Sequence, residues 1–83
     1  MLNNLIYTTS IQDGINPYRK GTFKHVLFQW SLEQKQFTRE EFLKAVIALK
    51  EENGVVSKMK DEVLNKAWWN EFKNKHKVFV SVE

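Results

Sequence analysis

The side chains that could take part in catalysis or metal binding are few and widely spaced along the chain. His25 and His76 are the only histidines, and there is no cysteine to act as a nucleophile or thiolate ligand. A histidine base needs a carboxylate partner, and a metal site needs further ligands at fixed spacing, such as HExxH. His25 is expected to be structurally ordinary. His76 lies among lysines, which disfavour its protonated form, with no adjacent carboxylate. We therefore expect neither a metal nor a cofactor.

Neighbouring carboxylates could form the acid and base pair of a glycosidase. Glu40 and Glu41, like Asp61 and Glu62, fall in the first turns of predicted helices, where acidic side chains complement the helix dipole. The three glycines are too dispersed to form a loop that cradles a phosphate. These patterns favour a protein that binds a partner over an enzyme.

The composition is that of one small folded domain spanning residues 1–83. Hydrophobic residues make up 42% and charged residues 28% of the chain, which is close to globular averages. No apolar run approaches the roughly 18 residues of a membrane span. The absence of cysteine fits a reducing compartment, so we expect a cytoplasmic protein. The lysine and asparagine bias is typical of AT-rich coding sequences, including those of bacteriophages, whose proteins act in the cytoplasm of a bacterial host.

Two helices are predicted in the first two thirds of the chain. Apolar residues recur at helical spacing from Phe23 to Trp30 and predict a helix over residues 22–35. Thr38 and Glu41 form a capping box, so a second helix should begin at Thr38 and end at the Asn53-Gly54 stop.

A third helix is predicted from a cap at Ser57 to about Lys75. Trp68 lies on its apolar stripe, as Trp30 does on that of the first helix, so both indoles are expected in the core. The stripe of the third helix consists of Val63, Leu64, Ala67, Trp68 and Phe72.

Alternating residues predict strands over residues 4–11 and 78–82, separated from the helices by loops. The expected fold class is α+β, in which a three-helix layer covers a short two-stranded sheet formed by the N- and C-terminal strands. This arrangement resembles winged-helix and helix-turn-helix domains in outline only. The second helix is too long, and the short glycine-containing turn of the simple motif is missing.

Positive charge is concentrated in two segments. Residues 17–24 carry a formal charge of +3, residues 57–77 carry six lysines against three acidic residues, and the remaining segments sum to −3. Such segments predict a patch that meets phosphates or an acidic protein surface. The alternative is a solvated, lysine-rich face that serves solubility.

Trp69 is predicted to lie about 150° from the centre of the apolar stripe, facing away from the first two helices. Lys66 and Lys73 are its neighbours on that face. An indole between lysines suits a stacked base or a protein hot spot. The alternative is that Trp69 packs on the sheet or the N-terminal segment.

The chain is thus expected to be a small nucleic-acid-binding accessory or regulatory protein. Only two arginines are present, which argues against specific base readout but not against phosphate contact by lysine. The alternative is a protein-binding modulator or inhibitor, such as a phage protein acting on a host factor through an acidic surface. The predicted binding residues are Arg19, Lys20, Lys66, Trp69 and Lys73.

Overall fold

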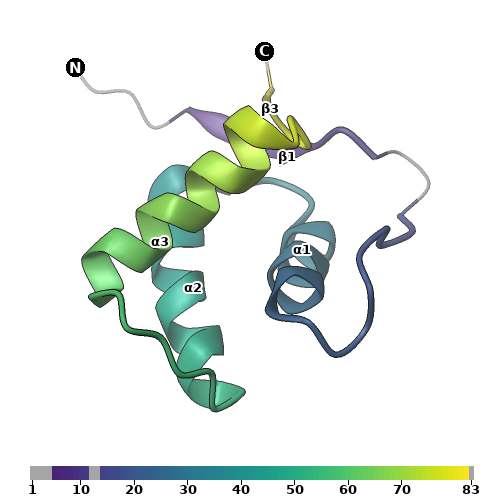
Figure 1. Cartoon of the computed structure of the whole chain (residues 1–83). Helices are drawn as coiled ribbons and strands as arrows, with labels where there is room; N and C mark the ends of the chain where they lie inside the picture. Colours follow the sequence, from purple (N-terminus) through teal and green to yellow (C-terminus); the bar gives the residue numbers. More distant parts are fainter. Residues whose placement is uncertain (1–4, 12–13, 83) are drawn as a thin grey trace.

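The structure, a computed structural model, describes residues 5–11 and 14–82. Within these ranges three α-helices, a π-helical turn and three short strands form an α+β fold, as the sequence predicted (Figure 1). None of the helices in these ranges is long and apolar enough to span a bilayer. The elements in chain order are β1 (Ile6–Thr9), α1 (Phe23–Gln34), β2 (Phe37–Thr38), α2 (Arg39–Glu52), α3 (Asp61–Asn70), η1 (Glu71–Lys75) and β3 (Phe79–Ser81).

The two predicted strands pair with each other, antiparallel, with Tyr7 opposite Ser81. The prediction of a two-stranded sheet was wrong, because β2 pairs with the other edge of β1 and gives the order β2-β1-β3. Thr38 explains why this third strand forms. An N-cap residue has extended backbone angles, here φ −97° and ψ 164°, so Thr38 can pair with β1 and cap α2 at once. Part of the predicted strand over 4–11 and of the loop after it lies outside the described residues.

A tight turn at Lys35 connects α1 to β2. Lys35 has φ 68° and ψ −48°, and the amide of Gln36 donates to the carbonyl of Gln34 at 2.7 Å, which is a classic γ-turn. This conformation is strained for a residue with a side chain. The hydroxyl of Thr8 donates to the Lys35 carbonyl at 2.7 Å and thereby ties the turn to the sheet.

Helix α2 has the ends that the sequence predicted. The amide of Glu41 donates to the Thr38 hydroxyl at 3.1 Å, and the Thr38 amide donates to the Glu41 carboxylate at 2.9 Å. At the other end Gly54 has φ +65°, and the amides of Gly54 and Val55 donate back to carbonyls of the last turn, as in a Schellman motif. Both ends of α2 are therefore fixed by local sequence.

Helix α3 begins later than predicted. Its N-cap is Lys60 and not Ser57, because the Ser57 hydroxyl instead accepts the amide of Met59 at 3.1 Å and closes a local turn. The predicted end at Lys75 is correct, although the last turn is π-helical.

The core is built mainly of aromatic rings from the sheet and all three helices. Trp30 and Trp68 were predicted to be core residues, but both are only partly buried at its margin. Trp30 packs on Phe37, and Trp68 stacks on Phe72. The fully buried rings, which define the centre of the core, are Phe28, Phe37, Phe42 and Phe72.

Candidate functional site

Trp69 is a core residue, contrary to the prediction that it is exposed. Its side chain is 5% exposed, and its ring meets that of Tyr7 edge-on at 4.8 Å between centroids. Phe42 and Phe79 lie 5.7 and 5.8 Å away. The error arose because the predicted orientation considered only the helices, whereas the sheet packs on the other flank of α3. The alternative, in which Trp69 packs on the sheet, is the one the structure adopts.

The predicted face of Lys66, Trp69 and Lys73 therefore offers no open indole. The Nζ atom of Lys73 lies 5.9 Å from the Tyr7 ring centroid, while Lys66 is exposed on the outward side of α3. Val63 and Ala67, which were predicted to lie on the apolar stripe of the helix, are exposed on that side as well. The rotation of α3 that buries Trp69 turns these two small apolar residues outward.

Arg19 and Lys20 are exposed in the loop that leads into α1. Asn16 holds this loop in place, because its side-chain amide donates to the carbonyl of His25 at 3.0 Å and its side-chain oxygen accepts the Tyr18 amide at 3.0 Å. The His25 side chain is partly exposed. The loop is fixed against α1 before the first helical turn begins.

Tyr18 connects this loop to the far end of the chain. Its ring packs edge-on against Phe28 at 5.3 Å, Phe72 at 5.7 Å and His76 at 5.8 Å, and the Nζ atom of Lys24 lies 5.7 Å from its centroid. Burial, and secondarily the charge of Glu71, raise the pKa of the Tyr18 hydroxyl above its usual value of 10. Tyr18 is therefore a neutral ring rooted in the core, against which polar side chains of two segments rest.

Three basic groups converge on one carboxylate oxygen beside Tyr18. The Oε2 atom of Glu71 lies 3.1 Å from His76 Nε2, 3.5 Å from Lys24 Nζ and 3.8 Å from Lys75 Nζ. The Nζ atom of Lys24 also lies 3.4 Å from His76 Nε2, across 52 positions of sequence. His76 thus has a carboxylate neighbour that sequence reasoning did not find. We call Lys24, Glu71, Lys75 and His76 the Glu71 cluster.

The π-helical turn creates the contact between Glu71 and His76. These residues are five apart, whereas an α-helix brings together side chains that are three or four apart. In η1 the amide of His76 donates to the carbonyl of Glu71 at 2.8 Å, so the turn is one residue wider. Rare π turns often occur at functional sites, which makes this one a useful marker.

Electrostatics at the Glu71 cluster favour an ionised carboxylate. Partial burial alone would raise the pKa of Glu71, but the hydrogen bond to His76 and the charges of Lys75 and Lys24 outweigh it and hold that pKa below its usual value. Glu71 therefore carries a full negative charge at neutral pH, surrounded by a larger number of basic groups.

The cluster joins the two basic segments of the sequence into one region, which we call the basic end and define as residues 19–24 and 71–77. It holds six cationic side chains and one carboxylate, a formal charge of +5, whereas the whole chain carries only +3. The rest of the protein therefore has a net charge of −2. The six cations are Arg19, Lys20, Lys24, Lys73, Lys75 and Lys77.

Two of the depressions beside helix α3 have mainly apolar linings. The first is a cleft of about 270 Å³ with largely apolar walls, to which Met59, Leu64 and Trp68 contribute, and Lys24 and Glu71 lie on its rim. This cleft adjoins the Glu71 cluster and contains the one partly exposed indole of α3.

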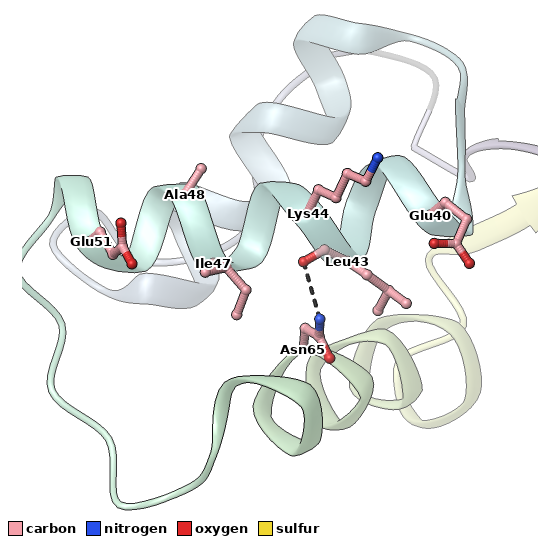
Figure 2. Close-up of a pocket in the computed structure, with 7 residues that line it drawn as sticks. All are labelled: Glu40, Leu43, Lys44, Ile47, Ala48, Glu51 and Asn65. Carbon is pink, nitrogen blue, oxygen red and sulfur yellow. Dashed lines mark hydrogen bonds between the residues drawn. The ribbon is translucent and has the colours of Figure 1, made fainter.

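The second depression is an open groove of about 500 Å³ between α2 and α3, drawn in Figure 2. Leu43 and Ile47 contribute apolar walls. The Asn65 amide donates to the Leu43 carbonyl at 3.3 Å, while the Asn65 Oδ1 atom is buried and finds no donor among the described residues. Glu40, Lys44 and Glu51 line this groove and give it a net charge of −1, which does not favour phosphate.

Among the described residues, no group of three or more histidine, aspartate or glutamate side chains is arranged to hold a metal ion. Comparisons with protein-family models, curated proteins and solved structures give no match. A functional assignment must therefore come from the geometry of the chain itself.

Proposed function

We propose that the protein is a non-enzymatic nucleic-acid-binding protein that holds backbone phosphates at its basic end. The observation that supports this proposal is the contact of Lys24 with Glu71 and His76, which brings together two basic segments far apart in sequence. Phosphate contacts by lysine supply most of the affinity of nonspecific nucleic-acid binding. The two segments carry a formal charge of +5 in a chain with a total of +3, and such an uneven distribution of charge is expected of a nucleic-acid-binding protein.

The proposed binding is independent of base sequence. Trp69 is buried and offers no stacking surface, and the chain has only two arginines for bidentate contact with guanine. Asp61 and Glu62 in the first turn of α3 would repel phosphates if that helix entered a groove of the duplex. Contacts to the backbone, and not to base edges, are therefore the mode that we propose. We propose that the protein acts in the cytoplasm.

Fluorescence anisotropy with labelled oligonucleotides tests the proposal. Wild-type protein should bind poly-dT and mixed-sequence strands with similar affinity, and the affinity should fall steeply as salt rises. Lys20→Ala and Lys75→Ala should each lower the salt slope by about 0.7, the value for one phosphate contact on a single strand. Lys44→Ala is the matched control, because it removes the same charge from α2 in the other groove. If all three variants lower the slope equally, or wild-type protein does not bind at low salt, the proposal is wrong.

A second candidate function, a protein-binding modulator, is favoured by the apolar cleft beside Trp68. Tryptophan is enriched in binding hot spots, and Trp68 is accessible where Trp69 is not. A protein partner should remain bound after nuclease treatment, should be lost with Trp68→Ala, and should be retained with Lys20→Ala. Loss of the partner on nuclease treatment would instead favour nucleic acid.

A further inference from the structure

The Glu71 cluster has an excess of basic groups around a single anionic oxygen. Two lysines and a histidine surround Glu71 Oε2 at 3.1 to 3.8 Å. Phosphate oxygens are bound in proteins by cationic donors of this kind, which form short, charge-assisted hydrogen bonds. A carboxylate oxygen and a phosphate oxygen present the same kind of acceptor to these donors. The surroundings of Glu71 Oε2 thus have the composition of a phosphate site.

We propose that Lys24, Lys75 and His76 form a phosphate-binding site in which the carboxylate of Glu71 occupies the place of the phosphate. Nucleic acid displaces the carboxylate when it binds, and a backbone phosphate takes over its contacts. This inference rests on the proposed function, because it assigns one of the phosphate contacts of the basic end to a specific set of side chains.

Two of the three basic groups rest on an aromatic ring that is anchored in the core. Tyr18 lies against both Lys24 and His76, and its ring is fixed by Phe28 and Phe72, which are fully buried. Lys24 and His76 therefore keep this support after Glu71 leaves, which lowers the entropic cost of binding a ligand.

The carboxylate can be exchanged because its contacts are accessible to solvent. The Glu71 side chain is 27% exposed, and the side chains of His76 and Lys24 are exposed to a similar extent. Lys75 is 73% exposed. Ion pairs that solvent can reach contribute little to stability, so replacing one anion by another costs little. A phosphate can reach the three basic groups without unfolding any part of the core.

The test compares Glu71→Gln with Glu62→Gln, which makes the same change of charge on the outward side of α3, away from the cluster. Glu71→Gln should bind a dT oligonucleotide about fivefold more tightly at about 0.1 M salt, because the phosphate no longer has to displace a carboxylate from its weak, solvent-accessible ion pairs. Glu62→Gln should give a smaller gain with an unchanged slope. Circular dichroism melts establish that both variants are folded.

Two results would overturn the inference. Equal gains in the two variants would mean that Glu71 acts only through net charge, and weaker binding by Glu71→Gln would mean that Glu71 organises the cations and does not compete for them. In either case lysine-dependent binding by wild-type protein leaves the proposed function standing. If no form of the protein binds oligonucleotide, the proposed function fails.

Titration with inorganic phosphate tests the phosphate site separately from nucleic-acid binding. Titration of Glu71→Gln with inorganic phosphate should shift the NMR signals of the His76 ring and leave those of His25 unchanged. Such a shift without oligonucleotide binding would identify a free phosphate compound as the ligand. The absence of a shift at His76, together with unchanged oligonucleotide affinity, would exclude the site.

Discussion

Helix α3 and its π-helical extension η1 form one segment, and its N-terminal and C-terminal halves differ in how well they are packed. In the N-terminal half Leu64 is buried, but Val63 is 52% exposed, and Met59, which precedes the helix, is also exposed. In the C-terminal half Trp69 and Phe72 are buried among rings from the sheet, α1 and α2. Figure 1 shows the same difference, because the C-terminal end of this helix lies beside the sheet and its N-terminal end lies away from the sheet.

The comparison indicates that the basic groups lie where the fold is most firmly determined. Lys24 and His76 rest on Tyr18, which packs directly on the aromatic core. The N-terminal half of α3 is tied to α2 by an ion pair between Lys50 and Asp61 at 3.1 Å, a contact accessible to solvent that contributes little to stability. A binding site at the C-terminal half is therefore preorganised, whereas one at the N-terminal half would not be.

The largest expected effect distinguishes the two halves directly. Trp69→Ala should lower the free energy of unfolding by about 3 to 5 kcal/mol, the range for truncating a buried indole, and so small a domain has little stability to spare. Val63→Ala, at an exposed position of the same helix, should change it by less than about 0.5 kcal/mol. Chemical denaturation of both variants measures the difference. Similar losses would show that the two halves are equally well packed.

A smaller effect of opposite sign is expected at Asn65, between the halves. Its Oδ1 atom is buried without a donor among the described residues, and such a group costs about 1 to 3 kcal/mol. The Leu43 carbonyl keeps its partner within α2 when the Asn65 amide is removed. Asn65→Leu should therefore raise the free energy of unfolding by about 1 kcal/mol, measured by urea denaturation. A loss of stability would mean that Oδ1 has a partner in solution, such as an ordered water.

The smallest effect is a dependence on pH at the Glu71 cluster. Because the folded-state pKa of Glu71 lies below its usual value, its ionised form stabilises the fold. That contribution is complete above the pKa of the unfolded state and is lost as the pH falls through the folded pKa. The stability difference between wild type and Glu71→Gln should therefore shrink on acidification below about pH 4. Thermal melts from pH 7 to pH 3 measure it, and a constant difference would contradict the assignment.

Local sequence predicted the parts of the fold that depend on local interactions. The capping box at Thr38 and the stop at Gly54 place α2 because each is complete within a few residues. The orientation of α3 was not predictable in this way. Whether Trp68 or Trp69 faces the core depends on Tyr7 and Phe79, which come from strands at opposite ends of the described chain.

The candidate site was predicted in part. The two basic segments were evident from charge alone, and Arg19 and Lys20 remain exposed as expected. The meeting of Lys24 with His76 could not be foreseen, because it requires the loop before α1 and the end of η1 to pack on the same ring. A π turn leaves no clear pattern in the sequence, so the pairing of Glu71 with His76 was also missed.

The π turn determines how the basic end responds to a change in chain length. Deleting Asn74 would leave Glu71 and His76 four residues apart, the spacing at which an ordinary α-helix already brings two side chains together. The carboxylate and the imidazole would therefore still meet, without the wider turn. The π turn accommodates one extra residue and keeps the same pair in contact, so in evolutionary terms an insertion here is absorbed without loss of the cluster.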